Sequence, residues 1–196
     1  MTKVFIDDIS SIKNEEDFSK IFETLPNLRK NKVLSHKFDD DRLLSLLVGK
    51  LLHDGLKEFG FEDFDRKVVL EENGKPYIPG NPVYFSISHS GTKGMVVISD
   101  SEVGCDIQII KSEDTSLATR FFTESECKEI SNSDNEHLTF YKMWTLKESF
   151  MKLTGKGLSF GLKNIHVDNC KINENNYASY FVNVDEKYVA CYVLKK

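Results

Sequence analysis

The sequence has no apolar run long enough to cross a membrane. Its longest apolar stretches, at residues 43–52 and 95–99, stop well short of the roughly 20 residues that a transmembrane helix needs. The first ten residues, MTKVFIDDIS, lack the basic segment and apolar run of a secretory signal, and neither end carries a lipidation motif. These absences exclude a transmembrane role and predict a cytoplasmic protein.

Cysteine is also scarce, and acidic residues outnumber basic ones. Cys105, Cys127, Cys170 and Cys191 are widely spaced, with no CxxC pair and no histidine at ligand spacing. Neither a disulfide framework nor a zinc site is indicated, and we expect reduced thiols, mostly buried. The formal net charge of -5 repels phosphate polymers, which argues against nucleic acid as a partner. A small anionic ligand, held by a few converging lysines and arginines, remains compatible with this charge.

No segment has the composition of a disordered or low-complexity region. The 196 residues are 40% hydrophobic and 29% charged, as in ordinary folded domains. A chain of this length forms one large domain or two small lobes that share a core.

Hydrophobic periodicity predicts both helices and strands in each half of the chain. Acidic residues at 39–41 precede a long amphipathic helix to about residue 59, and a capping box at 123–126 starts a short helix. A helix over residues 137–154 is expected to end at Gly155 and Gly157. Strands are expected at residues 3–7, 68–70, 165–167, 180–184 and 188–194, and three consecutive antiparallel strands over 83–110, after a surface loop at 71–82.

The helix over residues 138–154 carries polar groups beside its core face. Glu148 and Lys152 are four residues apart and next to Trp144, whereas Lys147 falls inside the apolar arc. The structural interpretation is that Lys147 extends along its neighbours to solvent and that Glu148 and Lys152 form an ordinary helix ion pair. The core face itself is formed by Phe140, Met143, Leu146, Phe150, Met151 and Leu153.

Asp106 occupies the middle of an otherwise apolar strand and shares a strand face with Gln108. An aspartate there is poorly solvated unless it is paired or binds a metal, and Gly104 leaves open space beside it. The alternative is a strand edge that faces water. Asp106 and Glu148, on two rigid elements, are the oxygen donors that Mg²⁺ uses while it keeps waters for a phosphate ligand.

Groups that suit a phosphate accompany these carboxylates. His89 lies between Ser88 and Ser90, so an anion site is credible, although a lone histidine is more often structural. Cys105 alternates with the polar positions and belongs to the core. No GxSxG motif occurs, so a Ser-His-Asp hydrolase is not indicated. Lysines that would neutralise phosphates are found at positions 75, 147 and 152.

Four motifs resemble the successive signatures of one enzyme family. They are GKP at 74–76, FSISHSG at 85–91, VGCDIQ at 103–108 and WTLKESFMKLTGKGLS at 144–159. Their order and spacing are similar to those of the 4'-phosphopantetheinyl transferases, in particular the longer, monomeric type that activates surfactin synthetase. The similarity extends from about residue 20 to residue 163.

This resemblance implies an α+β fold of two similar lobes related by a pseudo-twofold axis, each with a small antiparallel sheet and a packed helix. Residues 1–102 would form the coenzyme A nucleotide side, and residues 103–196 would carry the metal site and the catalytic helix. The implied enzyme transfers phosphopantetheine from coenzyme A to a serine of an acyl or peptidyl carrier protein. It requires Mg²⁺, releases 3',5'-bisphosphoadenosine and acts as a monomer.

The resemblance also implies residue roles in the second lobe. Asp106 and Glu148 would bind Mg²⁺, and Lys152 would meet the pyrophosphate, with Lys147 in the same Lys-Glu pair. Glu148 would be the base for the serine hydroxyl, and Lys152 would protonate or neutralise the departing oxygen. Gln108 departs from the pattern, because many members carry a glutamate there that also binds the metal. Its amide oxygen can still bind the metal or hold a metal-bound water.

In the first lobe, the resemblance implies contacts with the nucleotide and its phosphates. Lys75, Ser88 and His89 fall where the family binds these groups, and Arg42 matches the arginine for the 3'-phosphate. Lys30, in the stretch LRKNK, is a looser match that requires a gap.

Two alternative functions stay open. A metal-dependent phosphodiesterase or nuclease also uses carboxylates and a lysine, but the acidic charge and the absence of a basic stripe with aromatics argue against it. A non-catalytic module that binds coenzyme A or a carrier protein is supported by Gln108. It would not need Asp106, Glu148 and Lys152 together.

Overall fold

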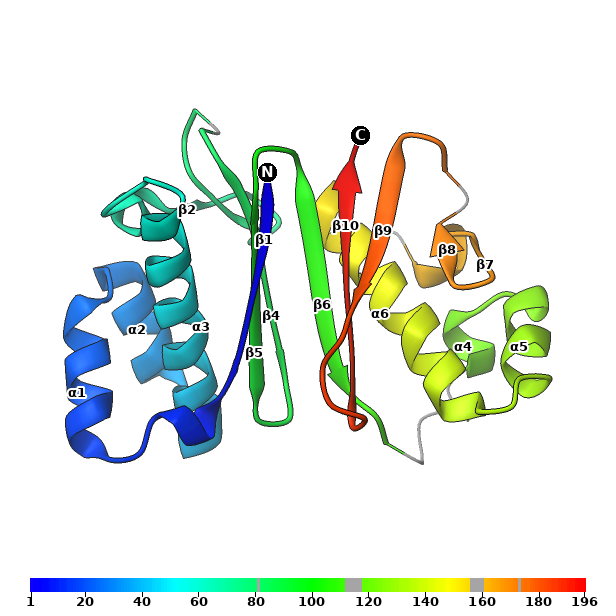
Figure 1. The fold of residues 1–196 in the computed structure, drawn as a ribbon, viewed down its shortest axis with the longest axis horizontal. Helices are drawn as coiled ribbons and strands as arrows, with labels where there is room; N and C mark the ends of the chain where they lie inside the picture. The colour runs from blue at the N-terminus through cyan, green and yellow to red at the C-terminus, as the bar shows by residue number, and fades with distance from the viewer. Residues whose placement is uncertain (81, 112–117, 156–160, 173) are drawn as a thin grey trace. The chain divides into compact units, whose positions relative to one another are not determined.

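The computed structural model describes residues 1–80, 82–111, 118–155, 161–172 and 174–196. The chain divides into two compact units, Met1–Asp100 and Ser101–Lys196. Each unit has a three-stranded antiparallel sheet with helices packed on it (Figure 1). The predicted α+β class is therefore confirmed. The pseudo-twofold relation, and the division into a nucleotide side at 1–102 and a metal side at 103–196, stay predictions.

The first unit is built on the sheet β1-β5-β4, in which both strand pairs are antiparallel. The long helix α3 packs against β5 and β1, and α1 and α2 pack against α3. Three aspartates in the first turn of α3 interact favourably with the helix dipole, as the sequence predicts. The elements are β1 (Thr2–Asp8), α1 (Glu15–Thr24), α2 (Asn27–Ser35), α3 (Asp39–Glu58), β2 (Val69–Leu70), β3 (Pro76–Tyr77), β4 (Tyr84–Ser90) and β5 (Lys93–Ser99), with short 3-10 helices at Ile9–Ser11 and Phe64–Lys67.

The second unit is built on the sheet β6-β10-β9. Helix α6 crosses one face of this sheet, in contact with β6 and β10 (Figure 1). Its predicted core face is buried throughout. The elements are β6 (Val103–Ile109), α4 (Ala118–Phe121), α5 (Glu124–Ser131), α6 (Glu136–Thr154), β7 (Val167–Asp168), β8 (Lys171–Ile172), β9 (Tyr177–Val182) and β10 (Tyr188–Lys195), with a 3-10 helix at Leu162–Asn164.

The predicted helix ends are confirmed where the structure describes them. Thr123 and Glu126 form both halves of the capping box of α5. Gly155 ends α6 with a φ of 67°, a left-handed conformation that glycine adopts readily. Gly157 lies outside the described residues.

Three expectations about strands and loops differ from the structure. The strand β6 does not continue the hairpin of β4 and β5 but pairs with β10. The expectation failed because alternation of polar and apolar residues identifies a strand without identifying its partner. The expected surface loop at 71–82 contains β3, which pairs with β2. The strand expected at 165–167 is reduced to β7, which follows a 3-10 turn.

Within the described ranges, no helix combines the length and apolar character needed to span a membrane. All four cysteines are free thiols. Cys105 and Cys191 are buried, whereas Cys127 and Cys170 are only half-buried.

Candidate active site

Asp106 on β6 is the centre of a polar cluster in the second unit. Its side chain is 2% exposed, and its Oδ1 accepts a hydrogen bond from Lys152 Nζ at 2.7 Å. Its Oδ2 accepts from Gln108 Nε2 at 3.0 Å. The prediction that Asp106 and Gln108 share a strand face is confirmed. The alternative of a water-facing edge at Asp106 is wrong, because this carboxylate is buried and paired.

Gly104 brings the strand of Asp106 against the catalytic helix predicted from the sequence. A Cβ at Gly104 would lie 2.0 Å from the Ser149 carbonyl oxygen and 2.3 Å from Leu153 N. The expectation of open space beside Asp106 is therefore wrong, because the backbone of α6 fills it. This close approach brings Glu148 and Lys152, on α6, to the strand that carries Asp106.

The electrostatics of the cluster follow from burial and from its two carboxylates. Desolvation raises the pKa of Glu148, repulsion from Asp106 raises it further, and Lys152 offsets part of the rise. Burial acts to lower the pKa of Lys152, but the attraction of Asp106, together with Cys105 and Glu148, outweighs it and raises this pKa. Lys152 is therefore held as a cation between two acids, and Glu148 is a stronger base than an ordinary glutamate.

This donor set fits Mg²⁺. In the described part of the chain, no three or more His, Cys, Asp or Glu side chains are grouped to hold a metal. Mg²⁺ does not need such a cage, because it is commonly bound by one or two carboxylates together with waters and substrate phosphates. Asp106 and Glu148 provide two carboxylates whose mutual repulsion a divalent cation would relieve.

Lys147 has a different environment from the one predicted. Its Nζ donates to Glu126 Oε2 at 2.6 Å and to the Leu162 carbonyl oxygen at 3.1 Å, and its side chain is fully buried. The structure does not support the prediction that Lys147 binds a ligand, and it does not extend to solvent either. The sequence identifies Glu126 as part of the capping box of α5. A capping box does not show that its glutamate also pairs with a lysine 21 residues away.

In the first unit, the predicted phosphate contacts lie on three separate elements. Lys75 follows the turn after β2, where its backbone N–H donates to Asn73 Oδ1 at 2.8 Å. Ser88 and His89 are neighbours on β4, with the serine buried and the histidine exposed. Arg42, in the first turn of α3, lies with its Nη1 3.5 Å from Asp39 Oδ1.

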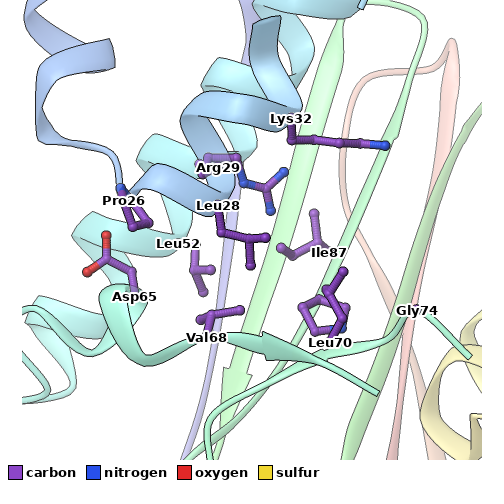
Figure 2. A pocket seen from close by; sticks show the side chains of 12 residues that line it. Pro26, Leu28, Arg29, Lys32, Leu52, Asp65, Val68, Leu70, Gly74 and Ile87 are labelled. Atoms are coloured by element: carbon purple, nitrogen blue, oxygen red, sulfur yellow. The ribbon is translucent and has the colours of Figure 1, made fainter. Parts of the chain in front are cut away.

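A cavity of about 280 Å³ lies between α2, α3 and the segments around β2, β3 and β4. Figure 2 shows Leu28 and Arg29 reaching into it from α2, opposite Val68 and Leu70. Most of its walls are apolar, and Gly74 contributes to the rim next to Lys75. The lining residues are Pro26, Leu28, Arg29, Lys32, Gly49, Leu52, Asp65, Val68, Leu70, Gly74, Pro76 and Ile87.

Arg29 is the main charged group of this cavity. It is half-buried, burial lowers its pKa, and it forms no ion pair or hydrogen bond with any residue that the structure describes. Gly49 on α3 gives it room, because a Cβ there would lie 2.9 Å from Arg29 Cγ. A partly desolvated guanidinium without an acidic partner is suited to bind an anion.

Lys30, the residue of the stretch LRKNK that the resemblance implies as a looser match, is not among the residues that line this cavity and stays a predicted contact. Lys30 pairs with Glu23 at 2.9 Å, and the cavity is lined instead by Arg29 and Lys32. The sequence feature that could have indicated these two residues is their three-residue spacing, which places Arg29 and Lys32 on one face of a helix.

Comparison with known proteins identifies the family. Residues 102–193 match the model of the 4'-phosphopantetheinyl transferase superfamily. The chain is 31% identical over 163 residues to the 4'-phosphopantetheinyl transferase Sfp of Bacillus subtilis strain 168, which covers 81% of this chain and 69% of that protein. The chain belongs to the 4'-phosphopantetheinyl transferases. It is of the Sfp type, as the sequence motifs predict, and it transfers phosphopantetheine to carrier proteins.

A second curated relative agrees with this assignment. The transferase is 30% identical to the 4'-phosphopantetheinyl transferase ffp of Bacillus subtilis over 92% of this chain and 80% of that protein. Among solved structures, the holo-[acyl-carrier-protein] synthase of Thermotoga maritima matches with a TM-score of 0.42 and 18% identity. That match covers 49% of this chain and 63% of the synthase. Members of the family use coenzyme A as a substrate.

Proposed function

We propose that this transferase moves the phosphopantetheine group of coenzyme A to a serine of an apo acyl or peptidyl carrier protein, with Mg²⁺. The serine oxygen forms a bond to phosphorus, the pyrophosphate P–O bond breaks, and 3',5'-bisphosphoadenosine leaves. The cluster of Asp106, Glu148 and Lys152 carries this proposal, because it sets two repelling carboxylates beside a lysine held as a cation. We place the reaction in the cytoplasm and assign it to the monomer.

Asp106 and Glu148 would hold the metal, with the Gln108 amide beside them. When bound, Mg²⁺ offsets the negative charge of the pyrophosphate. The hydrogen bond from Gln108 to Asp106 orients one carboxylate, so the neutral amide contributes even without a charge of its own.

Glu148 would accept the proton of the serine hydroxyl, directly or through a water. Its carboxylate, beside Asp106 and Lys152, is a group of the kind that serves as a positioned general base. Lys152 would stabilise or protonate the departing oxygen. Its pairing with Asp106 holds the ammonium group in place before substrate arrives.

The cavity beside α2 would bind the adenosine end of coenzyme A. Its apolar walls suit a base, and Arg29, with Lys32 beside it, would pair with the 3'-phosphate. Arg42, Lys75, Ser88 and His89 remain the proposed contacts to the nucleotide and its phosphates. Lys30 is the weaker candidate, since its ammonium group is already paired with Glu23.

The decisive experiment incubates the protein with coenzyme A, Mg²⁺ and purified apo acyl and peptidyl carrier proteins. We expect at least one carrier to gain the mass of phosphopantetheine on its serine, with release of bisphosphoadenosine. EDTA should stop the reaction and excess Mg²⁺ should restore it. Normal binding of coenzyme A with no modified carrier would favour the binding module. Cleavage of phosphodiesters without transfer would favour the nuclease.

Arg29→Gln is expected to weaken the binding of coenzyme A roughly 10- to 100-fold, because a charge-assisted hydrogen bond to the 3'-phosphate contributes about 1.5–3 kcal/mol. Dephospho-coenzyme A, which lacks this phosphate, should bind the variant and the wild type equally. Calorimetric titration measures both ligands. Arg66→Gln, which removes an exposed arginine paired with Asp63, is the matched control. Equal losses for both ligands would show that Arg29 does not hold the 3'-phosphate, and the same comparison on Arg42→Gln tests that residue.

A further inference from the structure

Lys147 and Glu126 form a buried ion pair that the proposed chemistry does not use. The two side chains are 0% and 2% exposed, with Nζ and Oε2 2.6 Å apart. The Lys147 ammonium group also donates to the Leu162 carbonyl oxygen at 3.1 Å and lies 4.8 Å from the centre of the Phe122 ring. These partners surround the ammonium group inside the second unit, where a ligand has no access to it.

Glu126 connects several elements through one carboxylate. Its Oε2 also accepts from the Thr123 backbone N–H at 2.8 Å, which completes the cap of α5. Its Oε1 accepts from the Val167 N–H at 3.1 Å, at the start of β7. Lys147 therefore ties α6 to the first turn of α5, to β7 and to the carbonyl of Leu162.

The opposite side of α6 is attached to the sheet. Gly104 lets β6 approach the backbone of α6, and Ser149 Oγ donates to the Cys191 carbonyl oxygen of β10 at 3.0 Å. Consecutive residues of a helix are about 100° apart around its axis, so Lys147 and Glu148 point to different neighbours. Holding Lys147 on one side and Ser149 on the other fixes the rotation of α6, and that rotation directs Glu148 and Lys152 toward Asp106.

We propose that the Glu126–Lys147 pair is a positioning device for the transfer reaction: it fixes the rotation of α6 and does not bind coenzyme A. The inference rests on the proposed function, because it takes Glu148 and Lys152 as the reacting pair. A buried ion pair is weak evidence for stability, since apolar side chains of similar volume often serve as well. What the pair adds is a defined orientation of α6. Its hydrogen bonds fit one arrangement of α5, α6 and β7, whereas apolar contacts tolerate several arrangements.

The test compares Lys147→Met, Glu126→Gln and the double variant with the wild type. Lys147→Met leaves the Glu126 carboxylate buried without its counterion, so we expect kcat to fall on the order of 10- to 100-fold as α6 shifts. The Kd of coenzyme A should change far less than kcat, because the proposed nucleotide contacts lie in the first unit and only the contact of Lys152 with the pyrophosphate moves with α6. In the double variant, Gln at 126 carries no buried charge, and its single amide oxygen can still accept from the Thr123 or the Val167 N–H, so kcat should recover part of the loss. Lys128→Met, an exposed lysine of α5, is the control.

All rates are measured at a temperature where circular dichroism shows the variant folded. If Lys147→Met does not fold, the double variant carries the test, with a reduced kcat and a much smaller change in Kd as the supporting result. A loss of coenzyme A affinity as large as the loss of kcat, persisting in the double variant, would overturn the proposal in favour of a ligand contact. A wild-type kcat in folded Lys147→Met or in the folded double variant would also overturn it. Glu148→Gln is assayed in parallel. A wild-type rate in this variant would contradict the proposed role of Glu148, independently of the result for the Glu126–Lys147 pair.

Discussion

Glu148→Gln is expected to reduce transfer roughly 100- to 10,000-fold, the range in which a positioned general base contributes. The amide has nearly the same shape as the carboxylate but neither accepts the serine proton nor carries the charge that would bind Mg²⁺. Transfer is followed by the intact mass of the carrier protein. Glu136→Gln, which removes an exposed glutamate from the first turn of the same helix, should leave the rate unchanged.

The same substitution is expected to leave the protein at least as stable as the wild type. The pKa of Glu148 is raised in the folded state by desolvation first and then by Asp106, so the ionised carboxylate opposes folding. This penalty is fully present above the folded pKa and disappears below the unfolded pKa. In urea unfolding with EDTA, the advantage of the variant should be greatest near neutral pH and shrink as the pH falls toward 4.5, the ordinary glutamate value. Transfer close to the wild-type rate, or a large loss of stability, would show that Glu148 is structural.

The two halves of the cluster around Asp106 could be predicted from the sequence because each lies on one element, whereas the hydrogen bond that joins them, between Asp106 and Lys152, spans 46 residues. Strand alternation placed Asp106 and Gln108 on one face, and helical spacing placed Glu148 and Lys152 next to each other. An aspartate in an apolar strand then required a partner, which the structure supplies as Lys152. Alternation and helical periodicity describe one element at a time, and this site needs only two elements.

The features that escaped prediction depend on contacts between distant segments. The partner of Lys147 is 21 residues away, and the partner of β6 is the last strand of the chain. Periodicity shows that Lys147 faces the core without showing which acid lies there. The position of Arg29 in the cavity wall escaped prediction for a similar reason, since only the packing of α2 on α3 decides which cations of LRKNK face the cavity.

Gly104→Ala is expected to abolish transfer and to destabilise the protein by about 1–3 kcal/mol or more, the usual cost of overpacking a core. The new methyl group would meet backbone atoms, the Ser149 carbonyl oxygen at 2.0 Å and Leu153 N at 2.3 Å, which cannot rotate away. The helix α6 must therefore move from β6, and Glu148 and Lys152 move with it, away from Asp106. Urea unfolding measures the stability, and the mass of the carrier protein measures transfer.

Gly55→Ala on α3 is the matched control for this prediction. Its Cβ would also be crowded, at 2.7 Å from Ile98 Cδ1 and 2.9 Å from Phe5 Cε2, but these atoms are the ends of side chains that can shift. Alanine also favours a helix by roughly 1 kcal/mol over glycine, which offsets part of the crowding. The control should therefore keep most of its stability and its transfer rate. If Gly104→Ala behaved like this control, the close approach of β6 and α6 would not be what places Glu148 and Lys152 at Asp106.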